Sequence, residues 1–176
     1  MPQISTKDFE RKVTNSLTRK LKILWDTSGL AHNEEMQTKI KSYPKVRWAA
    51  ENGFISLNKL IEITDAVGFS VAIVGDNSKI YPIIHDSNEN AKTYKRIIAD
   101  HNSSITEFAK AARLSVPYAS KMIVRTTSSF NTVFNLLEAY PGKLAILISS
   151  DIQIPINKEE IETMPRHQDL FSSKED

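Results

Sequence analysis

The chain has 176 residues, enough for one medium-sized domain or two small ones. Hydrophobic residues make up 40% and charged residues 25%, which is typical of a folded soluble protein and excludes wholesale disorder and low-complexity structure. The absence of cysteine excludes disulfides, thiolate zinc sites and cysteine nucleophiles. No apolar run could span a bilayer, and the first residues lack the apolar core of a signal peptide, so we expect a cytoplasmic protein with no membrane partner.

Charge is unevenly distributed along the chain. Residues 1–150 carry 20 basic and 14 acidic side chains, a net charge of +6, whereas residues 151–176 carry a net charge of −4. A basic body is a weak indication of a polyanionic partner such as nucleic acid. The acidic segment 157–176 contains Pro165 and has little periodicity, so we expect it to be a flexible tail.

Four helices are predicted in the first half from the spacing of apolar residues, at about residues 13–28, 36–40, 43–51 and 57–67. Pro44 favours the start of the third helix, because proline is tolerated in the first turn and cannot continue an older helix. Ser56 is typical of the cap of the fourth helix, and Gly68 of its end. Two stretches rich in β-branched residues follow, Ser70–Val74 and Lys79–Ile84, separated by turn-forming residues that predict a β-hairpin with Pro82 on an edge.

The second half repeats this plan. Apolar spacing predicts helices near residues 94–98, 108–112, 115–123 and 129–141, followed by two strands at 144–148 and 152–156. Similar residues recur at an offset of 72–74, as when Ser56-Leu57-Asn58 matches Ser129-Phe130-Asn131, which indicates an internal duplication. We therefore predict a first domain at 1–84, a linker at 85–90, a second domain at 91–156 and the tail at 157–176.

A helix, a tight turn and a second short helix form the plan of the helix-turn-helix motif. The stretch Ala109–Ile123 (AKAARLSVPYASKMI) resembles the core of the lambda-repressor/Cro-like (XRE-type) helix-turn-helix family. In this resemblance Ala109 matches the small residue of the second helix, and Arg113 matches a turn position where glycine is usual. Ser115 matches the cap of the recognition helix, and Ala119 one of its buried positions.

The first half resembles the same family without a gap from Leu17 to Gly53. It departs from the family pattern at Gln37, where a small residue is usual, and at Arg47, where an apolar residue is usual. Because a buried unpaired arginine is costly, we expect this helix to be rotated so that Val46 and Ala50 point inward. The first copy either reads DNA or serves as a dimerisation module.

The resemblance implies a mainly α fold, with two tandem domains of four to five helices, each followed by a short strand pair. It also implies a sequence-specific regulator of transcription that binds double-stranded DNA, a repressor of the phage or mobile-element type. A recognition helix presents its exposed face to base edges in the major groove. The candidate DNA-binding residues are Ser115, Val116, Pro117, Tyr118, Ser120, Lys121, Arg125 and Thr126 in the second copy and Tyr43, Lys45, Arg47 and Trp48 in the first.

Basic residues on the first predicted helix offer a further phosphate contact or a solvated surface: Arg11, Lys12, Arg19, Lys20 and Lys22. Trp25 extends the apolar stripe of that helix and is expected in the core. One helix-turn-helix reads few bases, so we expect a homodimer joined by strands whose exposed edges attract a partner, with a pseudo-dimer within one chain as the alternative.

The alternative function is an antitoxin-like or other protein-binding module, which neutralises a partner protein and regulates its own operator. We expect no enzymatic activity, because no nucleophile with an oriented base and no glycine-rich phosphate loop is present. The four histidines lack metal-ligand spacing, so no catalytic residue, metal site or cofactor is predicted.

Overall fold

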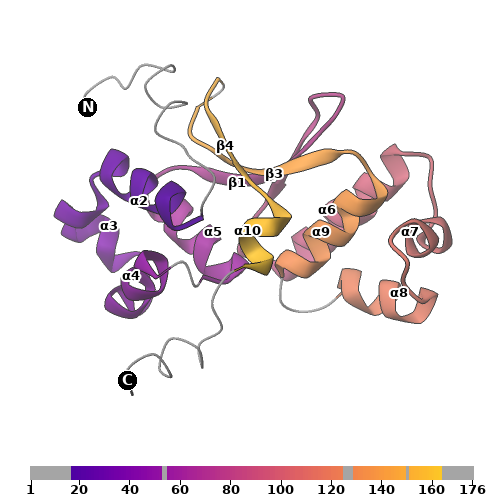
Figure 1. Ribbon diagram of the computed structural model, residues 1–176, viewed down its shortest axis with the longest axis horizontal. Coiled ribbons are helices and arrows are strands. Elements are labelled where there is room, and N and C mark those ends of the chain that lie inside the picture. Colours follow the sequence, from indigo (N-terminus) through magenta and orange to yellow (C-terminus); the bar gives the residue numbers. More distant parts are fainter. Residues whose placement is uncertain (1–16, 53–54, 125–128, 150, 164–176) are drawn as a thin grey trace.

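The computed structural model describes residues 17–52, 55–124, 129–149 and 151–163 (Figure 1). Within these ranges the chain is mainly helical, as predicted, and carries one small antiparallel sheet. The helices of the first half are α2 (Leu17–Ser28), the 3₁₀ helix η1 (Leu30–His32), α3 (Glu34–Thr38), α4 (Tyr43–Glu51) and α5 (Leu57–Ala66). Those that follow are α6 (Ser87–Asp100), α7 (Ile105–Ala111), α8 (Val116–Val124), α9 (Phe130–Ala139) and α10 (Lys158–Glu162). None of these described helices is long and apolar enough to cross a membrane.

The helix ends lie where local sequence signals predict them. The Ser56 hydroxyl accepts a hydrogen bond from the backbone N–H of Lys59 at 3.2 Å, which caps α5. The equivalent Ser129 caps α9 through the N–H of Thr132 at 3.3 Å. A cap of this kind satisfies one of the backbone donors that the first helical turn leaves unpaired. Gly29 ends α2 in the left-handed conformation, with φ 72°.

The strands are β1 (Ser70–Gly75), β2 (Ile80–Ile83), β3 (Gly142–Leu147) and β4 (Gln153–Ile156), arranged in the order β2-β1-β3-β4. Both predicted hairpins are present, and each places its proline on an outer strand, where the missing N–H breaks no pairing within the sheet. The sequence did not predict that the two hairpins join. β1 pairs antiparallel with β3 in the same chain, so these two strand edges are occupied without a second copy.

One face of the sheet carries the main core. Alternate residues on all four strands are buried on this face: Val71, Ile73, Tyr81, Ile83, Leu144, Ile146, Ile154 and Ile156. Such alternation is expected where an antiparallel sheet packs on helices with one face. The helices α5 and α9 lie on the same side of the sheet, α5 next to β1 and α9 next to β3 (Figure 1). The core therefore continues from one half of the chain to the other across the sheet.

The two halves repeat with a constant spacing of 73 residues. Helix α4 begins at Tyr43 and α8 at Val116, and both have nine residues. The strand register repeats as well, because Ala72 lies opposite Pro82 and Ala145 lies opposite Pro155. Ala72 and Ala145 are themselves paired at the centre of the β1–β3 ladder. This pairing relates the two hairpins by a local two-fold axis that passes through the sheet between the two alanines.

The predicted linker at 85–90 is wrong for most of its length, because α6 begins at Ser87. The Asp86 side chain caps this helix through the N–H groups of Asn88 and Glu89. Asn90 is buried, and its amide accepts from the N–H of Ile84 at 2.9 Å and donates to its carbonyl at 2.7 Å. The segment looked like a linker because aspartate, asparagine and serine favour turns and helix caps equally.

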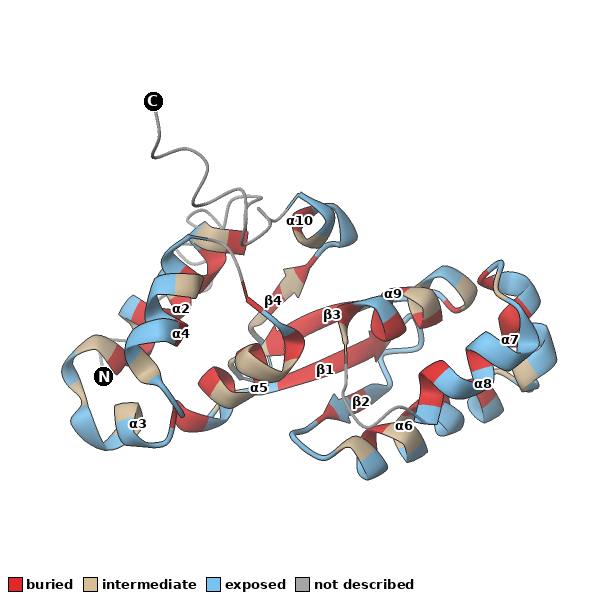
Figure 2. Ribbon diagram, turned by 90° about the horizontal axis from the view of Figure 1, so that it is seen from below, coloured by how far each residue is buried: buried red, intermediate tan, exposed pale blue. Residues whose placement is uncertain are grey.

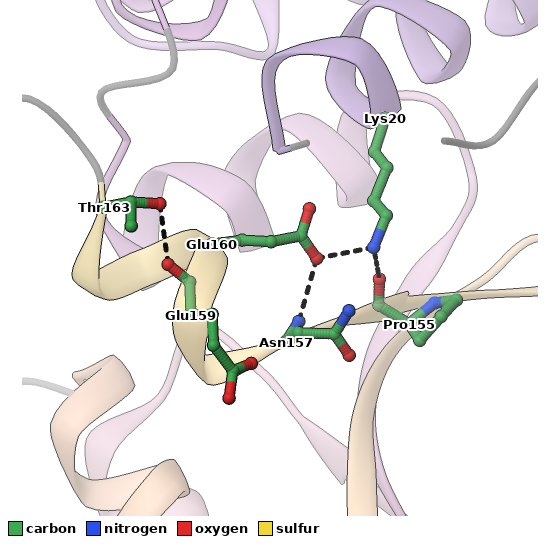
Figure 3. Close-up of polar contacts among 6 residues, drawn as sticks. All are labelled: Lys20, Pro155, Asn157, Glu159, Glu160 and Thr163. Carbon is green, nitrogen blue, oxygen red and sulfur yellow. Dashed lines mark hydrogen bonds and ion pairs between the residues drawn. The ribbon is translucent and has the colours of Figure 1, made fainter. Parts of the chain in front are cut away.

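The predicted flexible tail is also wrong at its start, where α10 packs against α2 (Figure 3). The Lys20 ammonium lies 2.5 Å from Glu160 Oε1 and donates to the Pro155 carbonyl at 2.6 Å. The same Oε1 accepts from the Asn157 N–H at 3.0 Å. Lys20 is therefore a buried structural residue, and its prediction as a phosphate contact is wrong. Residues 164–176 lie outside the described ranges.

Candidate nucleic-acid interface

Helix α8 is held by the segment α7–turn–α8. Arg113 lies in the turn with φ 58°, so the position where the resembled family favours glycine does take the left-handed conformation. The next residue, Leu114, donates its N–H to the Ala109 carbonyl at 2.8 Å, which closes the end of α7. Ser115 then caps α8 by accepting from the N–H of Tyr118 at 3.3 Å. These bonds fix the point and direction in which α8 leaves the turn.

Helix α8 has a buried and an exposed face. Ala119, Met122 and Ile123 are buried, as the resemblance implied. The structure brings six of the candidate residues together on the exposed side: Ser115, Val116, Pro117, Tyr118, Ser120 and Lys121. The helix contains no acidic residue, and Lys121 lies in its last turn. The other two candidates of this copy, Arg125 and Thr126, lie outside the described residues.

The Tyr118 side chain also contacts the neighbouring helix. Its hydroxyl accepts a hydrogen bond from Asn131 Nδ2 of α9 at 3.4 Å. Asn135, one turn further along α9, donates to the sulfur of Met122 at 3.5 Å. The sequence reasoning did not single out either asparagine. Their spacing of four residues on one helix face is the only sequence signal that indicates a shared neighbour.

Helix α4 is rotated as predicted. Val46 and Ala50 are buried, whereas Arg47 is exposed, so no arginine enters the core. Lys45 and Trp48 are exposed on the same helix. These three side chains, Lys45, Arg47 and Trp48, are the candidates of the first copy that the structure leaves accessible to a groove.

Tyr43 does not fit the prediction of a groove-reading residue. It is half-buried and stacks on Trp25, with ring centroids 5.6 Å apart. Trp25 itself is buried, which confirms its predicted place in the core. Aromatic stacking of this kind fixes the start of α4 against α2. Tyr43 therefore positions the helix and does not present a side chain to solvent.

The charges on α4 differ from those on α8. Arg47 Nε lies 3.0 Å from Glu51 Oε1, one helical turn away, and both side chains are about half exposed. The hydrogen bond to this carboxylate raises the pKa of Arg47 above its usual value, so the guanidinium stays charged at every relevant pH. Glu51 nevertheless offsets that charge locally, and it offers DNA a like charge beside the arginine.

The turn before α4 also differs from the turn before α8. Ser42 has φ 57° and makes no side-chain cap, unlike its equivalent Ser115. The N–H of Lys41 donates instead to the carboxylate of Glu62 on α5, which also holds Lys59 at 3.1 Å. Sequence reasoning missed Glu62, because a contact across 21 residues leaves no local signal. The two copies thus share element order but not turn geometry.

The two candidate helices lie far apart on one side of the molecule. In Figure 1, α4 is near the left end of the long axis and α8 near the right end, both on the helical side of the sheet. Figure 2, which views the molecule from below, again places them at opposite ends, with exposed residues on both. This placement is the one expected from the local two-fold axis between Ala72 and Ala145.

Comparisons with models of known protein families, with curated proteins and with solved structures found no match to this chain. Among the described residues no group of three or more histidine, aspartate or glutamate side chains is arranged to hold a metal ion. Functional inference therefore rests on the geometry of α4 and α8 and on their chemistry.

Proposed function

We propose that this protein is a sequence-specific, double-stranded DNA-binding regulator of transcription, of repressor type, that reads the major groove with α8 and with α4. The observation that carries the proposal is the exposed face of α8. A short helix that is capped by Ser115, anchored by three buried residues and free of acidic side chains is presented at the end of a helix–turn–helix segment. A helix held in this way fits the width of the major groove.

The exposed side chains of α8 suit both base edges and phosphates. Val116 and Pro117 offer apolar contact to a thymine methyl group, and the Ser120 hydroxyl can donate to or accept from a base edge. Lys121, in the last turn, suits a phosphate contact that adds affinity without sequence information. On α4, Arg47 offers the bidentate contact to guanine, worth about 1–3 kcal/mol of discrimination, once it leaves Glu51.

The experiment that tests this function is selection of a random-sequence duplex library on the purified full chain, followed by binding measurements on the enriched duplex. We expect one enriched motif. Lys121→Ala should then weaken binding to all sequences and reduce the salt slope by about one, the effect of losing one phosphate contact. Lys92→Ala is the matched control, because Lys92 is exposed on α6 and paired with Glu89 at 2.9 Å. Failure to enrich any motif would contradict the proposal.

A second candidate function, the protein-binding module, is supported by one observation on strand β2. Ile80 and Ile84 are 46% and 44% exposed, and both lie with exposed Pro82 on the outer edge of the sheet. An exposed apolar edge is a common site of strand or peptide addition. This function predicts that the wild-type chain captures a protein partner and that Ile80→Asp with Ile84→Asp does not. Equal recovery by both chains would contradict it.

A further inference from the structure

We infer that a single copy of this chain reads a DNA site made of two half-sites of unlike sequence, arranged about a local dyad. The inference rests on the proposed function and extends it to the form of the operator. It replaces the usual arrangement, in which two identical chains provide the two recognition helices.

The first step is the symmetry of the sheet. β1 and β3 pair antiparallel with Ala72 opposite Ala145, and each strand pairs on its other side with its own hairpin partner in the same register. Antiparallel pairing of equivalent strands places a two-fold axis perpendicular to the sheet. Both sets of helices then lie on one side of the sheet, as Figure 1 shows. A simple translation of one half onto the other would not give this arrangement.

The second step is the orientation of the two candidate helices. A two-fold axis relates α4 to α8, so the two helices face a duplex in opposite senses along its axis. The dyad of a DNA duplex has the same symmetry, which is why palindromic operators match two-fold repressors. The half-sites read by α4 and α8 therefore lie on opposite strands in an inverted arrangement, at a spacing of about one helical turn or a multiple of it.

The third step is the lack of symmetry in the exposed side chains. At the spacing of 73 residues, Lys45 corresponds to Tyr118, Arg47 to Ser120 and Trp48 to Lys121. Guanidinium and hydroxyl groups read different base edges. The backbone of the chain is thus two-fold while its reading surface is not. A site bound by this surface has the geometry of a palindrome without the sequence of one.

The fourth step concerns the connection between the halves. In symmetric repressors a second chain completes the pair, whereas here the β1–β3 ladder joins the halves within one chain. Core residues run across this joint, where Ile73 and Leu144 are paired and buried. The relative position of α4 and α8 is therefore fixed before DNA binds, and a second copy is not required to set it.

The experiment combines stoichiometry with a substitution that restores symmetry. Native mass spectrometry of the full chain on the enriched duplex should give one chain per duplex. The triple variant Lys45→Tyr, Arg47→Ser and Trp48→Lys copies the exposed residues of α8 onto α4, at three positions that are exposed. Selection with this variant should enrich a palindrome built from the α8 half-site and reduce affinity for the original duplex by tenfold or more, on the order of one lost bidentate contact.

The outcomes separate this inference from the proposed function. Failure to enrich any motif with the wild-type chain would overturn both. An enriched palindrome with two wild-type chains on it would overturn the inference and leave the function standing. An unchanged motif after the triple substitution would also overturn it, since α4 would then read no bases. The reciprocal variant, Tyr118→Lys with Ser120→Arg, should alter the other half-site, and it provides a second test if the triple variant does not fold.

Discussion

Replacement of Lys20 by methionine should destabilise the protein by about 3–5 kcal/mol. Its ammonium and the Glu160 carboxylate are 3% and 5% exposed, with 2.5 Å between Nζ and Oε1, and the ammonium also donates to the Pro155 carbonyl at 2.6 Å. Lys20→Met removes two charge-assisted hydrogen bonds, each worth about 1.5–3 kcal/mol. It also leaves a buried carboxylate without its cation, and breaking such a pair costs about 3–5 kcal/mol.

The assay is urea unfolding followed by circular dichroism, with Lys22→Met as control, because Lys22 is exposed on the same helix. The control should change the unfolding free energy by less than about 0.5 kcal/mol. A loss of 3–5 kcal/mol is a large part of the stability of an ordinary domain, about 5–15 kcal/mol. The double variant Lys20→Met with Glu160→Leu should recover most of the loss, since an apolar pair replaces the ion pair. Equal midpoints for Lys20→Met and Lys22→Met would refute the reasoning.

Three further predictions concern the folded state, each measured by urea unfolding. Gly142→Ala places a Cβ 2.6 Å from a backbone oxygen of the facing strand and should cost about 1–3 kcal/mol or more, whereas Gly75→Ala meets a movable side chain at 2.9 Å and should cost clearly less; equal losses would contradict this. Arg113→Gly relieves the strain of φ 58° and should stabilise the protein by about 0.5–1 kcal/mol, and any destabilisation would count against it. The hydrogen bond from Lys79 is the largest cause that lowers the pKa of Asp100, so this stabilisation is present near neutral pH and is lost as pH falls. The difference in stability between wild type and Asp100→Asn should therefore shrink between about pH 5 and pH 2, and a constant difference would contradict it.

Local signals predicted much of the secondary structure. Helix α4 begins beside Pro44 and α5 follows the Ser56 cap, because the conformational restriction of proline and the capping bond of serine act within one helical turn. The repeat offset of 72–74 was also readable, and the structure fixes it at 73. These features depend on neighbours in sequence, so no tertiary information was needed to find them.

Features that depend on distant partners could not be predicted. Residues 158–162 read as acidic tail because the residue that neutralises Glu160 is Lys20, 140 positions away. The joining of the two hairpins through Ala72 and Ala145 was missed for the same reason, since any exposed strand edge can pair within the chain or with another chain.

The candidate site was predicted unevenly. Six α8 residues lie together on an exposed face, because the apolar spacing of Ala119, Met122 and Ile123 determined which side is buried. In α4 the rotation that exposes Arg47 was predicted from the cost of burying a charge. The half-buried position of Tyr43 was not, because its stacking on Trp25 joins two helices whose mutual position the sequence does not specify.

The central claim is that this chain recognises a DNA sequence. The most direct measurement is fluorescence anisotropy of the full chain on the enriched duplex and on a scrambled duplex of equal composition, at salt concentrations of about 50–200 mM. Binding to the enriched duplex should be at least about a thousandfold tighter, as in specific complexes, and both affinities should fall as salt rises. Equal affinity for the two duplexes at every salt concentration would contradict the claim.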